Sequence, residues 1–291
     1  MTQVRLFICA RKPEANHIAS ILDAAFDEDT VPTALFEEEG KPGSWCYSLY
    51  VEEDEADAWR GRIHEILGSD CFGLPLQTER LGDVDWVSET LKDLKPVSAG
   101  QYFVHGSHDR AAARHKRFPV EIDAGQAFGT GHHGTTAGCL DMLEETLKSN
   151  DPDIAFDVGT GSGVLAISLA KSCTAAIVAT DIDPVSVEVA AENARINGVA
   201  SAIHFETATG FHHRVFRDYC AADVILANIL AGPLAALAPA LARHTAPGGT
   251  VILSGLLPHQ ETRIRATYRN QGLVFHRRHI RDGWLTLVLK G

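Results

Sequence analysis

Three glycines at positions 159, 161 and 163 separate an apolar run that contains Asp157 from an apolar stretch with helical character. Glycines at a strand-to-helix turn leave bare backbone against which a ligand can lie. The N-terminus of the following helix offers unpaired N–H groups and a partial positive charge to an anionic group. A second apolar run ends in Asp181, whose carboxylate can hold a ribose diol. This spacing predicts a site for a nucleoside-containing cofactor.

The glycine loop is compatible with two cofactors. Gly161, Gly163 and Ala166 satisfy the dinucleotide fingerprint G-x-G-x-x-G/A. The run from Asp157 to Gly163, an acid followed by three alternating glycines, resembles the first motif of the class I S-adenosylmethionine-dependent methyltransferases. Asp181 suits either cofactor, and its spacing argues against glycines that only make a tight turn. The loop by itself therefore leaves NAD and S-adenosylmethionine (SAM) open.

Asn228 follows the apolar run 224–227, which predicts that it lies at the carboxyl end of a strand. Ligands of open α/β sheets bind at these ends. The position resembles that of the asparagine in the Asn-Pro-Pro-Tyr/Phe motif of amino-group methyltransferases, with Ile229 and Leu230 in place of the two prolines. We expect Asn228 to contact the cofactor and to orient an attacking amine. The alternative is that Asn228 caps the helix that starts near Ala231.

A second glycine-rich loop, residues 125–134, precedes a helix expected at 135–147. Small residues before a helix form a backbone concavity that suits a ligand. Histidine pairs occur at 132–133 and 212–213. We interpret them as surface-loop residues and expect no metal site, because zinc needs three or four convergent ligands.

Periodicity and turn residues predict two kinds of fold along the chain. The first part alternates as β-α-β-β-α-β, the ferredoxin-like order, with strands at 4–9, 33–37, 44–51 and 74–81 and helices at 14–26 and 55–67. The second part alternates strands with helices, which predicts a doubly wound, Rossmann-like α/β sheet whose strands are 154–158, 176–181, 202–206, 223–228 and 249–254. Two final strands, 273–280 and 284–290, are expected to form an antiparallel end. We place a ferredoxin-like α+β domain at 1–83, a linker helix at 84–100 and the α/β domain at 101–291.

Charge and cysteine usage limit the function further. The net charge of the 291 residues is -12, and residues 1–100 carry 9 Lys and Arg against 20 Asp and Glu. Such an acidic domain repels phosphate, so we expect no sequence-specific nucleic-acid binding. It would attract a basic partner, and the alternative is that the acidic surface only aids solubility. The six cysteines have no paired spacing, which indicates reduced thiols and not a disulfide framework. Without a long apolar run or a signal-peptide pattern, we expect no membrane span and a cytoplasmic location.

The segments 123–140, 157–163, 181–184 and 227–234 closely resemble the bacterial methyltransferases that modify large-subunit ribosomal protein eleven. The resemblance covers nearly the whole chain and implies a SAM-dependent enzyme that methylates lysine side chains and the N-terminal amine of that protein. From the charge of residues 1–100 we expect the acidic domain to dock this basic substrate. Carried over by position, it implies that the cofactor is contacted by the second loop and the two motifs, through Phe128, Thr136, Gly159, Gly161, Gly163, Asp181 and Asn228. His132 and Gly134 depart from the family's usual Thr and Pro.

Three alternatives remain. A small-molecule or RNA methyltransferase would share the glycine loop, but the acidic first part and the Asn228 motif argue against it. A lysine methyltransferase that acts on a different basic protein would have the same catalytic domain. An NAD-binding or nucleotide-sensing protein would share the glycine loop and Asp181 but would have no use for Asn228 at the tip of its strand.

Overall fold

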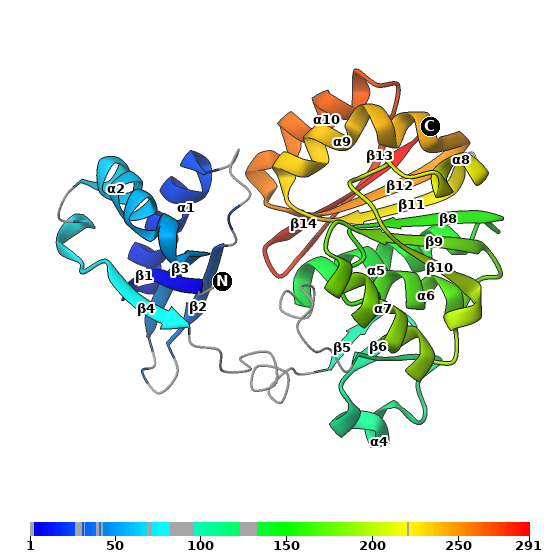
Figure 1. Ribbon diagram of the computed structural model, residues 1–291, viewed down its shortest axis with the longest axis horizontal. Helices are drawn as coiled ribbons and strands as arrows, with labels where there is room; N and C mark the ends of the chain where they lie inside the picture. Colours follow the sequence, from blue (N-terminus) through cyan, green and yellow to red (C-terminus); the bar gives the residue numbers. More distant parts are fainter. Residues whose placement is uncertain are drawn as a thin grey trace. The chain divides into compact units, whose positions relative to one another are not determined.

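The computed structural model describes residues 3–26, 31, 33–38, 41, 43–68, 71–81, 96–122, 133–219 and 221–291. The chain divides into two compact units, Met1–Val84 and Asp85–Gly291, which are described separately (Figure 1). The expected linker helix, apart from its last residues, lies outside the described residues, as do Phe128 and His132.

The first unit is a small antiparallel sheet with two helices. Its strands follow the order β2-β3-β1-β4, and neighbouring strands are antiparallel. Along the chain, the four strands and the two α-helices follow the predicted β-α-β-β-α-β order, which is thereby confirmed. The elements are β1 (Gln3–Arg11), α1 (Lys12–Ala25), β2 (Thr33–Glu37), β3 (Ser44–Glu52), η1 (Glu53–Glu55), α2 (Ala56–Leu67), η2 (Cys71–Gly73) and β4 (Gln77–Leu81).

Period-two alternation along β1 separates the two faces of this sheet. Leu6 and Ile8 are buried in one cluster with Leu22 of α1 and Ile63 of α2. Side chains at alternate positions of a strand point to opposite faces. The residues between these core positions, such as Arg5, therefore lie on the face opposite the helices. There the Arg5 guanidinium donates a hydrogen bond to Ser48 Oγ and forms an ion pair with Glu79.

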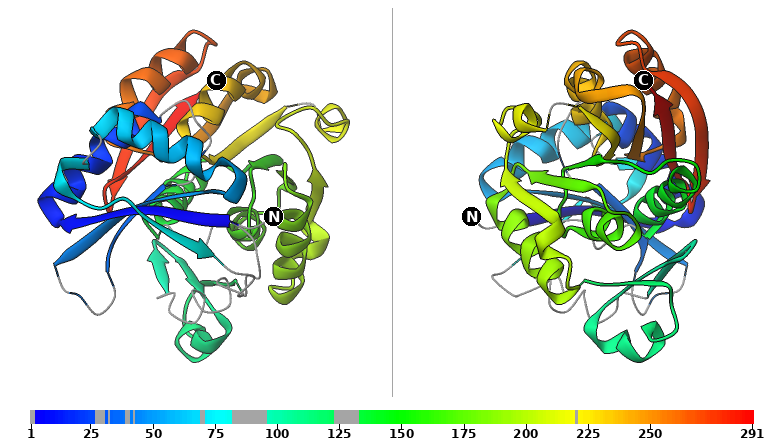
Figure 2. Two further views of the ribbon diagram at one scale, coloured as in Figure 1. Left: turned by 60° about the vertical axis from the view of Figure 1, so that its left-hand side comes forward. Right: turned by 90° about the vertical axis from the view of Figure 1, so that its right-hand side faces the viewer.

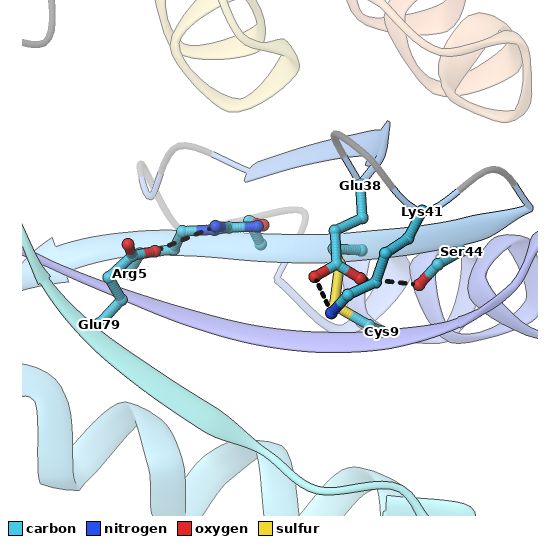
Figure 3. Close-up of a disulfide and its surroundings, with 8 residues drawn as sticks. Arg5, Cys9, Glu38, Lys41, Ser44 and Glu79 are labelled. Carbon is cyan, nitrogen blue, oxygen red and sulfur yellow. Dashed lines mark hydrogen bonds and ion pairs between the residues drawn. A yellow bond between two sulfur atoms is a disulfide. The ribbon is translucent and has the colours of Figure 1, made fainter.

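The prediction that all cysteines are reduced is wrong for one pair. Cys9 of β1 and Cys46 of β3 are joined by a disulfide on the face opposite α1 and α2 (Figure 3). The cause is the strand register, which places Cys9 directly opposite Cys46. Directly opposed residues of antiparallel strands share a face, and their Cβ atoms are close. The separation of 37 residues in sequence gave no sign of this contact.

The second unit contains a seven-stranded sheet of order β10-β9-β8-β11-β12-β14-β13. The first five of these strands are parallel. β14 is antiparallel to β12, and β13 pairs antiparallel with β14, which confirms the predicted antiparallel end. A separate three-stranded sheet, β5-β6-β7, precedes it. The strands are β5 (Val97–Ala99), β6 (Tyr102–His105), β7 (Phe118–Glu121), β8 (Ile154–Val158), β9 (Ala176–Asp181), β10 (Ile203–Thr207), β11 (Ala222–Asn228), β12 (Thr245–Leu256), β13 (Val274–Arg281) and β14 (Trp284–Lys290).

Helices cover both faces of the seven-stranded sheet (Figures 1 and 2). Along β11, Val224 and Leu226 pack into the cluster that contains α5 and α6, whereas Ile225 packs into the cluster that contains α9 and α10. A strand buried on both faces reads as a continuous apolar run, which is why the sequence predicted it. The helices are η3 (Ser107–Asp109), α4 (Arg110–Ala113), α5 (His133–Leu147), α6 (Val164–Ser172), α7 (Pro184–Ile196), η4 (Ala200–Ala202), α8 (Val215–Asp218), α9 (Ala231–His244), η5 (Pro258–Gln260) and α10 (Glu261–Arg269). Among the described helices, none combines the length and the apolar character that a bilayer crossing requires.

Candidate active site

Three neighbouring parallel strands bring the predicted site residues to one edge of the sheet. β9, β8 and β11 are adjacent and parallel. The glycine loop follows β8, Asp181 ends β9 and Asn228 ends β11. Because the carboxyl ends of parallel strands share an edge, these groups face the crevice in which open α/β sheets bind their ligands. The structure thus brings the two sequence motifs together.

The glycine loop has a backbone that only glycine adopts readily. Gly159, Gly161 and Gly163 have φ angles of +76°, +53° and +83°. L-residues with a side chain are strained in this region. A Cβ atom at Gly159 would also overlap Cγ2 of Ile229, the residue after Asn228. The loop therefore exposes backbone because both its dihedral angles and its neighbours exclude side chains.

Asp181 is held in place by the loop that it faces. Its Oδ2 accepts a hydrogen bond from the Gly161 N–H at 2.8 Å, and its Oδ1 accepts one from the Asp183 N–H at 3.1 Å. A carboxylate has about four acceptor positions. The two oxygens of Asp181 can therefore accept further hydrogen bonds from a diol while their orientation is fixed by the backbone.

Asp157 has a structural place in the loop. The side chain is 1 % exposed, and its Oδ2 accepts hydrogen bonds from Thr160 Oγ1 and from the Ala166 N–H at 2.7 and 3.0 Å. Within the described residues, its Oδ1 has no hydrogen-bond partner. Burial raises the pKa of Asp157 to about 6, with a smaller contribution from the charge of Asp181. The ionised carboxylate is thus disfavoured in the folded state.

The Asp157→Asn variant is expected to remove one pH-dependent component of stability. Because the pKa rises from 3.8 to about 6 on folding, the native state holds the proton more tightly, and stability falls as pH rises through that window. The penalty above pH 6 is about 3 kcal/mol at most. Urea unfolding of the wild type and Asp157→Asn between pH 4 and 8 measures it as the difference between the two curves. Parallel curves would contradict the prediction.

Asn228 contacts the start of α5 and does not cap α9. Its Nδ2 donates to Thr135 Oγ1 at 3.4 Å. The N-cap of α9 is Leu230, and no side chain caps that helix end. The capping alternative is therefore wrong, and among the described residues no hydrogen bond to the amide oxygen of Asn228 is found. An acceptor oxygen at the carboxyl end of β11 is available to a donor such as an amine.

Sequence reasoning missed a buried serine that anchors this region. Ser254 of β12 is paired in register with Asn228 and is fully buried. Its hydroxyl donates to the Thr135 carbonyl oxygen at 3.2 Å and accepts from Thr286 Oγ1 at 3.0 Å. These bonds join β12 and β14 to the first turn of α5. Thr136, expected to contact the cofactor, lies in the same turn and is 6 % exposed.

Loss of the Ser254 hydroxyl is expected to destabilise the second unit by about 1–3 kcal/mol, since its buried hydrogen bonds to the Thr135 carbonyl oxygen and to Thr286 Oγ1 are removed. Urea unfolding of Ser254→Ala, followed by hydrogen exchange of the β12 amides, measures this loss. Ser168 is a matched control because it is equally buried and its hydroxyl bonds only the Val164 carbonyl of its own helix. An equal effect of Ser168→Ala would refute a specific role for the anchor.

Within the described residues, histidines do not gather into a group that could bind a metal ion. His204 Nε2 lies 3.0 Å and His213 Nε2 lies 3.8 Å from different oxygens of Glu206. Across the described ranges, one group of three potential ligands has its donor atoms within 4.8 Å of one another, namely Cys9, Glu38 and Cys46. The sulfur atoms of this group are joined in the disulfide.

A mostly parallel seven-stranded sheet with an antiparallel hairpin, a glycine loop after β8 and an acid at the end of β9 define a class I SAM-dependent methyltransferase. Comparison with known proteins identifies the family within this class. The family model described as "Ribosomal protein L11 methyltransferase (PrmA)" matches residues 16–291. The chain belongs to this family of SAM-dependent protein methyltransferases.

Relatives resemble the chain over its full length. A protein named ribosomal protein L11 methyltransferase from Brucella suis is 49% identical over 290 residues, which cover 100% of both chains. One of the same name from Allorhizobium ampelinum is 44% identical over 290 residues, again 100% of both chains. The crystal structure of a ribosomal protein L11 methylase from Lactobacillus delbrueckii subsp. bulgaricus has 29% identity and a TM-score of 0.58, and the match covers 67% of this chain and 97% of that chain.

Proposed function

We propose that this enzyme transfers methyl groups from SAM to amines of large-subunit ribosomal protein L11, on lysine side chains and the N-terminus. The observation that carries the proposal is Asn228 at the carboxyl end of β11, beside the glycine loop. The full-length relatives named for L11 supply the substrate. Residues 1–83 would recognise this substrate, 84–100 would link the two parts and 101–291 would catalyse. The enzyme would act on this substrate in the cytoplasm.

The residues after β8 and β9 suit SAM. The bare backbone at Gly159–Gly163 would receive the amino-acid part of the cofactor, and α6 begins there without a side-chain cap. The Asp181 carboxylate would accept hydrogen bonds from the ribose hydroxyl groups. Thr136, in the first turn of α5, would complete the site. Phe128, also expected near the cofactor, lies outside the described residues. When bound, SAM supplies an electrophilic methyl group on a sulfonium.

Asn228 would select and aim the amine. A lysine with its ordinary pKa of about 10.4 is almost fully protonated at neutral pH, and only the neutral amine has a lone pair to attack. The Asn228 amide oxygen would accept an N–H of the neutral amine and so turn its lone pair toward the methyl group. The enzyme would favour that neutral form by desolvation.

The experiment that tests the function is a methylation assay with the full-length enzyme. Labelled SAM is incubated with purified L11, with intact ribosomal subunits and with a basic protein of similar charge, and the labelled residues are located by mass spectrometry. Label on L11 amines that disappears with Asn228→Ala supports the proposal. Label only on the other basic protein would favour a different substrate, and label on RNA would overturn amine methylation.

The acidic first unit would dock the basic substrate. Glu53, Asp54 and Glu55 are consecutive and exposed, and within the described part of the chain Glu53 pairs with Arg80. Neutralising all three with amides is expected to raise KM for L11 roughly three- to tenfold at low salt and to reduce its salt dependence. Neutralising Asp151, Glu188 and Glu192, which are exposed acids of the second unit, is the matched control. Equal KM values for the two triple variants would contradict docking by the first unit.

A further inference from the structure

The Cys9–Cys46 pair differs from the other described cysteines. Its two sulfur atoms come from directly opposed positions of β1 and β3. Among the described residues, Cys71 and Cys139 are buried and belong to no disulfide, and Cys173 is half-buried and likewise belongs to none. Burial raises the pKa of the Cys139 thiol to about 12 and also raises the pKa of Cys173. Thiols held in the neutral form react slowly.

The two residues of the pair are unequally exposed. Cys46 is 1 % exposed, whereas Cys9 is partly exposed on the sheet face that α1 and α2 leave open. An external reagent therefore has more access to Cys9 than to Cys46. A reachable thiol next to a buried one is the arrangement in which the first sulfur reacts with a reagent and the second resolves the product.

The side chains around the pair favour disulfide chemistry over cation binding. Glu38 places a carboxylate oxygen within 4.8 Å of both sulfur atoms. This carboxylate already accepts hydrogen bonds from Lys41 Nζ at 2.8 Å and Ser44 Oγ at 3.0 Å (Figure 3). Those bonds lower the pKa of Glu38. A divalent cation would have to displace the positive charge of Lys41, whereas a disulfide leaves the Glu38–Lys41 pair intact.

We propose that Cys9 and Cys46 form a reversible dithiol–disulfide site that reacts with low-molecular-weight disulfides of the glutathione type. In the first step the Cys9 thiolate attacks one sulfur of the small disulfide, forms a mixed disulfide and releases one small thiolate. In the second step the Cys46 thiolate attacks Cys9 Sγ, forms the Cys9–Cys46 bond and releases the second small thiolate. The protein dithiol is oxidised by two electrons, and the small disulfide is reduced to two thiols. An excess of the small thiol reverses both steps.

The test uses the reduced, full-length enzyme treated with oxidised glutathione at pH 8, with peptides mapped by mass spectrometry. The wild type is expected to form the Cys9–Cys46 disulfide and to lose two hydrogens. Cys46→Ser is expected to stop at the mixed disulfide on Cys9. Cys9→Ser is expected to react at Cys46 at least about tenfold more slowly, because that sulfur is buried. Cys173→Ser serves as the matched control and should behave as the wild type.

Three outcomes would overturn the proposal. A wild type that retains both thiols or accumulates only mixed disulfides has no such site. Equal reactivity of Cys9→Ser and Cys46→Ser contradicts the assigned order of steps. Uptake of one Zn²⁺ by the reduced wild type that protects both thiols and is lost in Glu38→Gln assigns a metal site instead. SAM binding within about twofold of the wild type shows that the second unit is intact in each variant, and an unchanged urea-unfolding transition of the first unit, which contains the pair, shows that this unit is folded.

Discussion

Replacement of Asn228 by alanine is expected to lower kcat for amine methylation by roughly 100- to 1000-fold. The amide oxygen at the end of β11 is the acceptor that would orient the amine, and alanine leaves nothing in its place. The glycine loop and Asp181 remain, so the Kd of SAM should change by less than about tenfold. Steady-state kinetics at saturating SAM and calorimetric titration with SAM measure the two quantities on the same protein preparation.

Two further variants separate positioning from folding. Asn228→Asp keeps an acceptor oxygen but cannot donate to Thr135 Oγ1, so an intermediate kcat is expected. Asn150→Ala removes an exposed amide whose only described bond is to the Thr146 carbonyl, and it should leave kcat unchanged. A normal kcat for Asn228→Ala, together with a loss of stability, would assign the residue a structural role and remove the main support for amine methylation.

The motifs were predictable from sequence because their chemistry is local. The glycine run, Asp181 and Asn228 each follow a buried parallel strand, and such strands are continuous apolar runs. The carboxyl ends of those strands share an edge once the fold class is known. No knowledge of long-range packing was needed to expect the three groups in one place, and the structure places them there.

The features missed depend on register between distant segments. Ser254 meets Thr135 because β12 pairs with β11 and α5 packs on both, a separation of 119 residues. Cys9 meets Cys46 only because β1 and β3 align them. The predicted start of β12 at residue 249 was wrong for a related reason. An irregularity in its pairing with β11 between Ala222 and Val224 lets the strand begin at Thr245, through two glycines that predict a turn.

Removal of the Asp181 carboxylate is expected to weaken SAM binding at least about 100-fold, because hydrogen bonds to a charged acceptor contribute roughly 1.5–3 kcal/mol each and a diol makes two. Asp181→Ala also leaves the Gly161 N–H without its acceptor, which loosens the loop that faces the cofactor. Calorimetric titration with SAM and with NAD measures both affinities. A wild type that binds NAD more tightly than SAM would contradict the cofactor assignment itself.

Asp183→Ala is the matched control for this loss. Asp183 lies two residues away, and its carboxylate caps α7 through the Val185 and Ser186 N–H groups. Its removal should cost about 1 kcal/mol of stability while SAM affinity stays within about threefold. The two aspartates also differ in their effect on Asp157, whose pKa is raised partly by the charge of Asp181. Asp181→Ala should therefore lower the pKa of Asp157. If Asp183→Ala weakened SAM binding as much as Asp181→Ala, the loss would reflect a disturbed end of β9. That result would contradict the proposed hydrogen bonds between the Asp181 carboxylate and the ribose hydroxyl groups.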